Sequence, residues 1–229
     1  MTIRTEAETI RILKQDLFTA VVGDILDVLG YRKQFLPPGL APLQPGARIA
    51  GRAMPVLEAD VFGTGLDTSA GPLAHKPFGL MLEALDDLKE GEIYIATGAS
   101  LNYAIWGGLM STRATHLKAA GAVLDGYVRD VGEILALGFP VFCRGVYAQD
   151  QGPRGKVIDY RTTIEIGGVI ISPGDLVYGD DEGVLIIPTS IVDKVVTQAL
   201  EKVRTENQVA SAIKNGMSAT EAFSTFGVM

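Results

Sequence analysis

A cation and two carboxylates follow directly after an apolar run in the middle of the chain. The run extends from Ala122 to Val128, and Arg129, Asp130 and Glu133 come immediately after it. Such a run predicts a buried strand, and ligands bind at the carboxyl ends of strands in open α/β sheets. An arginine binds a carboxylate through two parallel hydrogen bonds, and an aspartate holds a hard divalent cation. The pattern therefore predicts a site that binds and polarises a 2-oxo acid.

The same residues also fit the start of a helix. Asp130 at the N-cap and Glu133 three residues later form a capping-box pattern, and Gly138 would end the helix after an apolar turn. Spacing alone favours this capping role, although a helix N-terminus at the end of a strand is itself an anion site. Arg129 fits the capping role less well, because a charge at the end of an apolar strand needs a partner. A bound anion is one option for that partner.

A second candidate for ligand binding is the helix start at Gly107 and Gly108, followed by Leu109 and Met110. Glycines let the backbone approach a ligand, and the free amides of a first helical turn form a cradle for a carboxylate or phosphate. The alternative is that the glycines only make a turn. The residues of a P-loop and of a dinucleotide-binding fingerprint are missing. Because consecutive β-to-α junctions of a parallel sheet open at the same edge, we expect these amides and Arg129 to face one ligand.

Composition excludes several classes of protein. The chain has 229 residues, of which 47% are hydrophobic and 21% are charged, as in a globular protein. A net charge of −7 argues against broad binding to a nucleic-acid backbone, although it is compatible with a basic protein partner. The single cysteine, Cys143, excludes an intrachain disulfide and is expected to be buried. The two histidines, His75 and His116, make a histidine-rich metal site improbable.

The chain carries no signal for membrane insertion or export. No apolar run approaches the about 18–20 residues of a transmembrane helix. The first residues, Met1 to Glu6, are polar and lack the apolar core of a signal peptide. We therefore expect a cytoplasmic protein with neither a membrane nor a nucleic acid as partner.

Helical and strand patterns alternate over the first two thirds of the chain, and they predict an α/β protein. The central third follows a β-loop-α-β-α-β order, which is typical of a parallel sheet with right-handed crossovers. In chain order the predicted elements are a helix over 7–29, a loop over 36–47, a strand over 50–57, a Gly- and Pro-rich loop over 59–79, a helix over 80–88, a strand over 93–96, a helix from 108 to about 120, a strand over 122–128, a helix over 130–137 and a strand over 140–143.

The pattern becomes antiparallel in the last third. Gly167 and Gly168 divide the run 164–171 into a hairpin, and turns flank the short strands 176–178 and 184–187. A long amphipathic helix runs from Pro188 to about residue 214, and a capping box at Ser218 opens a short terminal helix. Nothing marks a linker, so we expect one domain over residues 1–229.

Several motifs together resemble those of the RraA-like family, over about residues 15–215. That family includes the 4-hydroxy-4-methyl-2-oxoglutarate/4-carboxy-4-hydroxy-2-oxoadipate aldolases and the regulators of ribonuclease E activity. Its aldolases show an acidic residue or a glycine, then twenty residues, then Arg-Asp-x-x-Glu/Asp, and Gly108, Arg129, Asp130 and Glu133 follow this spacing. The motifs that carry the resemblance are Gly107-Gly108-Leu109, Ala120–Val123, Asp125–Asp130, Leu137–Phe142, Pro173–Asp175 and Asp180–Val184.

The resemblance implies a layered α/β/β fold with a parallel βαβ central portion, an antiparallel portion and a long C-terminal helix. It also implies a divalent-metal-dependent lyase that cleaves or decarboxylates a 2-oxo acid through a metal-stabilised pyruvate enolate, as aldolases and oxaloacetate decarboxylases do. The family usually forms trimers or hexamers with sites between subunits, and we expect helices 189–229 to contribute to those contacts. By analogy, Asp130 would bind Mg²⁺ or Mn²⁺ as the metal ligand, and Arg129 with the amides near Leu109 and Met110 would hold the pyruvoyl oxygens. His75 and Lys76 lie in the loop where the family varies its substrate contacts, and they are either ligands for a distal carboxylate or plain surface residues.

The chain departs from the family pattern at one position. The characterised aldolases carry Asp where this chain has Gly108. Glu133 is the nearest carboxylate in sequence that would compensate. Glu206 on the long C-terminal helix would either come from a neighbouring subunit or lie on a solvated helix face, and its position favours the solvated face.

Two other functions remain open. One is a non-catalytic protein-binding regulator of the ribonuclease E inhibitor type, but Asp130 favours the enzyme because the regulators lack an aspartate after the arginine. The other is a quinone methyltransferase, which the missing Gly-rich nucleotide loop disfavours.

Overall fold

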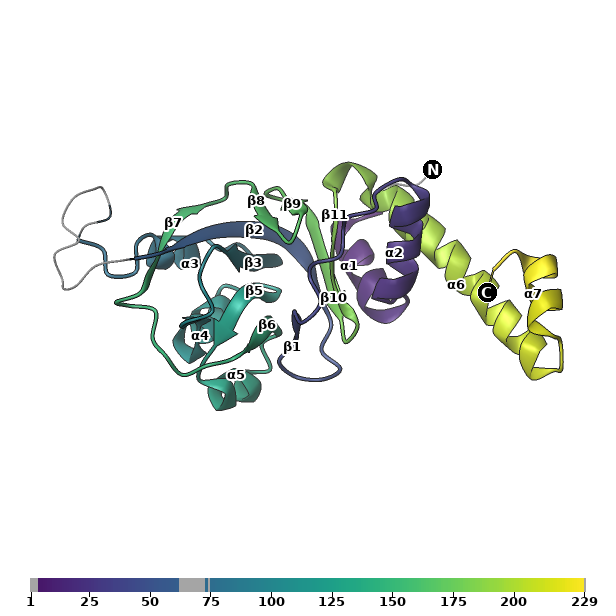
Figure 1. The fold of residues 1–229 in the computed structure, drawn as a ribbon. Helices are drawn as coiled ribbons and strands as arrows, with labels where there is room; N and C mark the ends of the chain where they lie inside the picture. The colour runs from purple at the N-terminus through teal and green to yellow at the C-terminus, as the bar shows by residue number, and fades with distance from the viewer. Residues whose placement is uncertain (1–3, 62–72, 74, 229) are drawn as a thin grey trace.

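A curved mixed sheet forms the centre of the molecule (Figure 1). The computed structural model describes residues 4–61, 73 and 75–228. Within them β4 (Ala104–Trp106) pairs with β5, and β7 (Gly155–Tyr160) pairs with β2. The main strand order is β1 (Ala41–Pro42), β6 (Val141–Val146), β5 (Gly121–Val128), β3 (Glu92–Thr97), β2 (Ile49–Asp60), β10 (Leu176–Asp180) and β11 (Gly183–Ile187).

The strands β2, β3, β5 and β6 run parallel, as the sequence predicts for the central third. They are buried on both faces, so the molecule is layered. One face packs against α3 (Met81–Asp86), α4 (Gly108–His116) and α5 (Val131–Leu137), and its core contains Trp106 and Tyr94. The other face packs against the predicted hairpin of β8 (Ile164–Ile166) and β9 (Val169–Ile171). This arrangement confirms the layered α/β/β fold.

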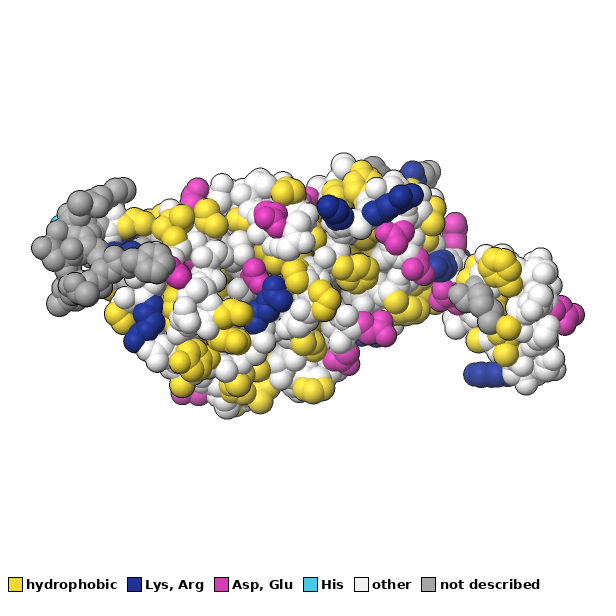
Figure 2. All heavy atoms as spheres, viewed as in Figure 1, with side chains coloured by type: hydrophobic (Ala, Val, Ile, Leu, Met, Phe, Trp, Pro, Cys, Tyr) yellow, Lys and Arg dark blue, Asp and Glu magenta, His cyan; other side chains and the backbone are white. Residues whose placement is uncertain are grey.

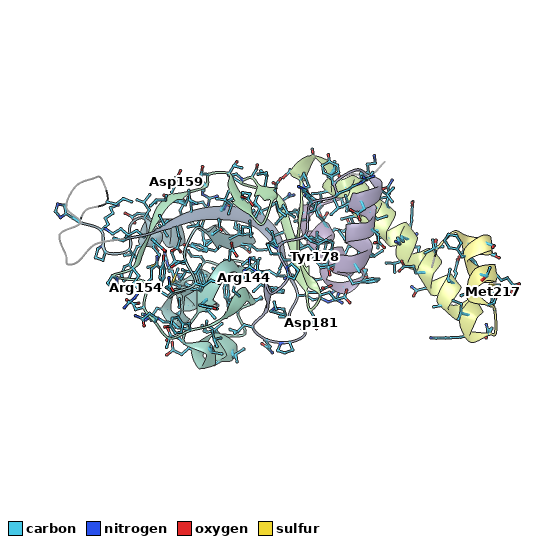
Figure 3. The ribbon with its side chains drawn as sticks, in the orientation of Figure 1. Arg144, Arg154, Asp159, Tyr178, Asp181 and Met217 are labelled. Carbon is cyan, nitrogen blue, oxygen red and sulfur yellow. The ribbon has the colours of Figure 1, made fainter. Side chains whose placement is uncertain are left out.

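The antiparallel strands β10 and β11 carry a separate helical layer. It consists of α1 (Glu6–Gln15), α2 (Thr19–Val28) and the first half of α6 (Val192–Lys214), and Tyr178 lies buried between the sheet and these helices (Figure 3). The predicted long C-terminal helix is thus confirmed, as is the terminal helix α7 (Ala219–Phe226), whose cap Ser218 accepts a hydrogen bond from the Glu221 amide. Among the residues that the structure describes, no helix has both the length and the apolar character needed to cross a membrane.

The single helix predicted over 7–29 is wrong, because the structure has two helices there. The second begins at Thr19, whose backbone N and Oγ1 donate to the Asp180 carboxylate on β10 at 2.8 Å and 2.6 Å. The helical spacing of apolar residues continues across this break, because Leu17 and Val21 on either side of it are both buried. The spacing therefore does not reveal where the first helix ends. The helix predicted to reach about residue 120 also ends early, at His116, since Lys118 takes a left-handed conformation with φ of +59°. The short strands β1, β4 and β7 were not predicted.

Substituting Asp180 by Ala is expected to lower the free energy of unfolding by about 2–3 kcal/mol, because it leaves the buried donors of Thr19 without a partner. Urea unfolding followed by circular dichroism measures this loss. Asp181→Ala is the matched control, because among the described residues its carboxylate accepts a single hydrogen bond, an exposed one from the Gly46 amide. Equal losses in the two variants would contradict the role of Asp180.

Candidate functional site

Arg129 and Asp130 lie between β5 and α5, at the carboxyl end of a central strand as predicted. The capping-box prediction for Asp130 is wrong, because its side chain makes no hydrogen bond to α5. Asp130 has φ of +57°, and this left-handed backbone turns the carboxylate away from its own helix. Its Oδ2 instead accepts a hydrogen bond of 3.1 Å from the Gly108 amide at the start of α4. Asp130 therefore connects two neighbouring β-to-α junctions.

The two glycines at the start of α4 leave room for carboxylates. A Cβ atom at Gly107 would lie 2.7 Å from Oδ2 of Asp130. A Cβ atom at Gly108 would overlap Oε2 of Glu133, and it would also lie 3.1 Å from the Glu133 Cβ. Neither glycine has a positive φ, so close approach rather than backbone freedom accounts for them. The carboxylate of Glu133 thus occupies the space next to Gly108 that a side chain there would need.

Arg129 has a protein partner that the sequence analysis did not predict. Its Nη1 lies 2.9 Å from Oδ1 of Asp150, in the loop after β6, and its Nε lies 3.7 Å from Oδ2 of Asp130. Each of these three side chains is about 40% exposed, so solvent screens the pairs. Asp150 also follows a parallel strand, so the strand-end rule that found Arg129 would have placed it at the same edge.

A cavity of about 410 Å³ opens beside these groups. Its polar end contains Arg129, Asp130, Asp150 and Gln151, together with the backbone at Gly107. Leu109 and Met110 from the first turn of α4 also line it. The structure therefore brings together, around one cavity, most of the residues that were predicted from the two junctions. Gly108 and Glu133 lie directly behind this lining and contact Asp130 and each other.

Other predicted residues lie elsewhere. His75 is exposed, and Lys76 pairs with Glu83 on α3. Neither residue lines the cavity. The rest of that loop, residues 62–72 and 74, lies outside the described residues. Glu206 lies on α6, where its Oε1 is 3.8 Å from Nζ of Lys202, and it does not line the cavity.

A buried carboxyl group lies behind the cavity. Glu58 on β2 is 2% exposed, and its Oε2 accepts a hydrogen bond of 2.9 Å from Nε2 of Gln151. Burial raises the pKa of Glu58 to about 8, with a further contribution from the negative charge of Asp60. The group is therefore mostly uncharged at neutral pH. A glutamate directly after the apolar run 53–57 was the available signal, and the prediction did not use it.

The donors at the polar end fit a hard divalent cation. Among the described residues there is no group of three or more His, Cys, Asp or Glu side chains that could hold a metal. Mg²⁺, however, is commonly held by one or two carboxylates and keeps several of its waters. The part-exposed carboxylates of Asp130 and Asp150 at the cavity provide such oxygen donors.

Comparison of the whole sequence with known families identifies the class of protein to which this fold and this cavity belong. A family model described as Aldolase/RraA matches residues 19–186, and the chain belongs to the RraA-like family. Protein DlpA of Legionella pneumophila is 30% identical over 222 residues, which cover 95% of this chain and 34% of that protein. The chain thus spans about a third of the length of this relative.

Two further similarities extend the comparison. A Halalkalibacterium halodurans protein with the provisional name 4-hydroxy-4-methyl-2-oxoglutarate aldolase is 32% identical over 144 residues, 62% of this chain and 68% of that one. The crystal structure of RraAS2 from Streptomyces coelicolor, described as an unusual member of the RNase ES inhibitor RraA family, superposes with a TM-score of 0.74. It is 24% identical, covers 90% of this chain and 98% of its own, and supports the fold.

Proposed function

We propose that this chain is a divalent-metal-dependent lyase that releases pyruvate from a 2-oxo acid by aldol cleavage or decarboxylation. The observation that carries the proposal is the convergence of Arg129, Asp130 and the start of α4 on one cavity. The provisional aldolase name of the Halalkalibacterium halodurans relative supports the same class of reaction.

Each group has a distinct role in this proposal. The guanidinium of Arg129 binds the substrate carboxylate, and Asp150 holds the arginine side chain at the cavity. The amides of Leu109 and Met110 lie in the first turn of α4, where backbone donors lack acceptors within the helix, and they bind the oxygens of the pyruvate unit. A Mg²⁺ or Mn²⁺ ion held by Asp130 would polarise the keto oxygen and offset the negative charge that develops there. The Gly108 amide keeps the Asp130 carboxylate at the cavity, and Glu133 fills the space beside Gly108.

Pyruvate release, coupled to lactate dehydrogenase and NADH, tests the function. We expect turnover of oxaloacetate and of 4-hydroxy-4-methyl-2-oxoglutarate that requires Mg²⁺ or Mn²⁺ and stops in EDTA. No turnover of any 2-oxo acid, together with salt-sensitive capture of a basic partner by this acidic chain, would favour the alternative of a protein-binding regulator.

We also propose that the chain assembles into a trimer or hexamer through its C-terminal helices. The second half of α6 and α7 extend away from the body (Figure 1), and hydrophobic side chains lie on this projecting part (Figure 2). Ile213 and Phe223 are 38% and 58% exposed there. Light scattering should give three or six chain masses, and truncation after Val203, which keeps the core part of α6, should reduce that number. A monomeric full-length chain would contradict the proposal.

A further inference from the structure

The cavity also has an apolar wall. This wall comes from α3, from the segment just before it and from the first turn of α4. A carboxylate placed against it would lose hydration without gaining hydrogen-bond donors, whereas an alkyl or aryl group would lose only unfavourable contact with water. The side chains of the wall are Phe78, Met81, Leu82, Leu85, Leu109 and Met110.

The charges of the described lining also disfavour a second substrate carboxylate. Both guanidinium groups of this lining already have carboxylate partners: Arg129 pairs with Asp150, and Nε of Arg113 lies 2.8 Å from Oδ1 of Asp86. Asp130 adds a third carboxylate. The proposed cation at Asp130 and the paired Arg129 would serve the pyruvate end of the substrate, so the described lining offers a distal carboxylate only Arg113, whose charge Asp86 already offsets.

We propose that the substrate is a 2-oxo monocarboxylate whose distal part is apolar and packs against the wall formed by α3 and α4. This inference rests on the proposed function, because Arg129 is taken to hold the pyruvate end. In the aldol case the C3–C4 bond of a 4-hydroxy-2-oxo acid breaks, and the 4-hydroxyl gives up its proton to become the carbonyl of an apolar aldehyde. The electron pair stays with C3, which takes up a proton to give pyruvate. No oxidant or reductant is needed.

The single tryptophan of the chain reports binding in this cavity without turnover. Trp106 lines the cavity, is 2% exposed and is held by a hydrogen bond of 2.7 Å from Nε1 to Oγ of Ser111. Suitable probes are 5-methyl-2-oxohexanoate and 2-oxoglutarate, which differ only by an isopropyl group in place of the distal carboxylate. In fluorescence titrations of the Mg²⁺-loaded full chain, we expect the isopropyl compound to bind at least tenfold more tightly. Equal or tighter binding of 2-oxoglutarate would overturn this inference but not the proposed function.

Cleavage assays separate this inference from the proposed function. We expect a higher kcat/KM for 4-hydroxy-2-oxo-4-phenylbutanoate than for 4-hydroxy-4-methyl-2-oxoglutarate. Preference for the dicarboxylate would overturn the inference and leave the function standing, while turnover of neither compound, with binding of neither probe, would overturn both.

A charge placed on the wall provides the reciprocal test. Leu82→Arg puts a cation on a side chain that is 57% exposed, so we expect the variant to fold and to bind 2-oxoglutarate more tightly than 5-methyl-2-oxohexanoate. Leu135→Arg on α5 is the matched control, because Leu135 is 42% exposed and does not line the cavity. This control should keep the preference of the unmodified chain. An unchanged preference in Leu82→Arg would show that the distal group lies elsewhere and would overturn the inference.

Discussion

The Asp130→Asn variant is expected to lose about 100- to 1000-fold in kcat/KM for pyruvate release, while its urea midpoint stays unchanged. Asparagine accepts the left-handed conformation of this residue, and its carbonyl oxygen still accepts the hydrogen bond from Gly108. The substitution therefore removes the negative charge and keeps the local geometry. The loss should be accompanied by weaker dependence on Mg²⁺, which is measured by titrating the metal in the coupled assay.

A matched control shows whether the effect belongs to the site. Asp159 lies exposed on β7 (Figure 3), and within the part of the chain that the structure describes its side chain accepts a hydrogen bond from the next amide alone. Asp159→Asn should therefore retain full activity and metal dependence. Turnover by Asp130→Asn at the rate of this control would remove Asp130 from the proposed mechanism.

The stability of the fold is expected to fall as the pH rises from about 5 to about 9, in large part because of Glu58. Burial raises the pKa of Glu58 in the folded chain to about 8, whereas its ordinary value is 4.5. Above pH 4.5 the unfolded chain releases this proton while the folded chain retains it, so the unfolded state gains stability. The difference amounts to a loss on the order of 3–5 kcal/mol, complete once the pH exceeds the folded pKa.

The Glu58→Gln variant isolates this contribution. Glutamine has nearly the same shape and cannot ionise, so the variant should become more stable than the unmodified chain above pH 8 and should show a flatter pH dependence. Urea unfolding at pH 5, 7 and 9 measures both. Glu182→Gln, on an exposed turn, should follow the unmodified chain. If Glu58→Gln and the unmodified chain gave parallel curves, Glu58 would have to be ionised in the folded protein at neutral pH.

Much of the fold was predictable because the central strands are buried on both faces. Burial of that kind makes the start of each strand a short apolar run before a charge and a glycine, as in 122–124 and 141–143. The break between α1 and α2 was not predictable, since it depends on a hydrogen bond from Thr19 to Asp180, which lies 161 residues further along the chain. The strand β7 also depends on a distant partner, because it pairs with the end of β2.

The candidate site also has features that the sequence predicts and features that it does not. Arg129, Asp130 and the helix start at Gly107 follow consecutive parallel strands, so local sequence and one topological rule place them together. Spacing could not reveal that Asp130 adopts a left-handed conformation, and this determines that its carboxylate reaches α4 rather than capping α5. The strand-end rule also places the loop after β6 at this edge, but that Asp150 and Gln151 of this loop line the cavity is evident only from the folded structure.

The helix α6 spans two regions that differ in packing. Its first half contributes Val192, Val195, Val196 and Ala199 to the core over β10 and β11. After Ala199, the buried residue of α6 is Val209, which lies in the projecting half of the helix that leads to α7 (Figure 1). We therefore expect this one uninterrupted helix to belong to two cooperative units. In native-state hydrogen exchange at a concentration low enough to dissociate the proposed assembly, amides near Val195 should exchange only on global unfolding, whereas amides beyond Val203 should exchange through local opening at a much lower free energy.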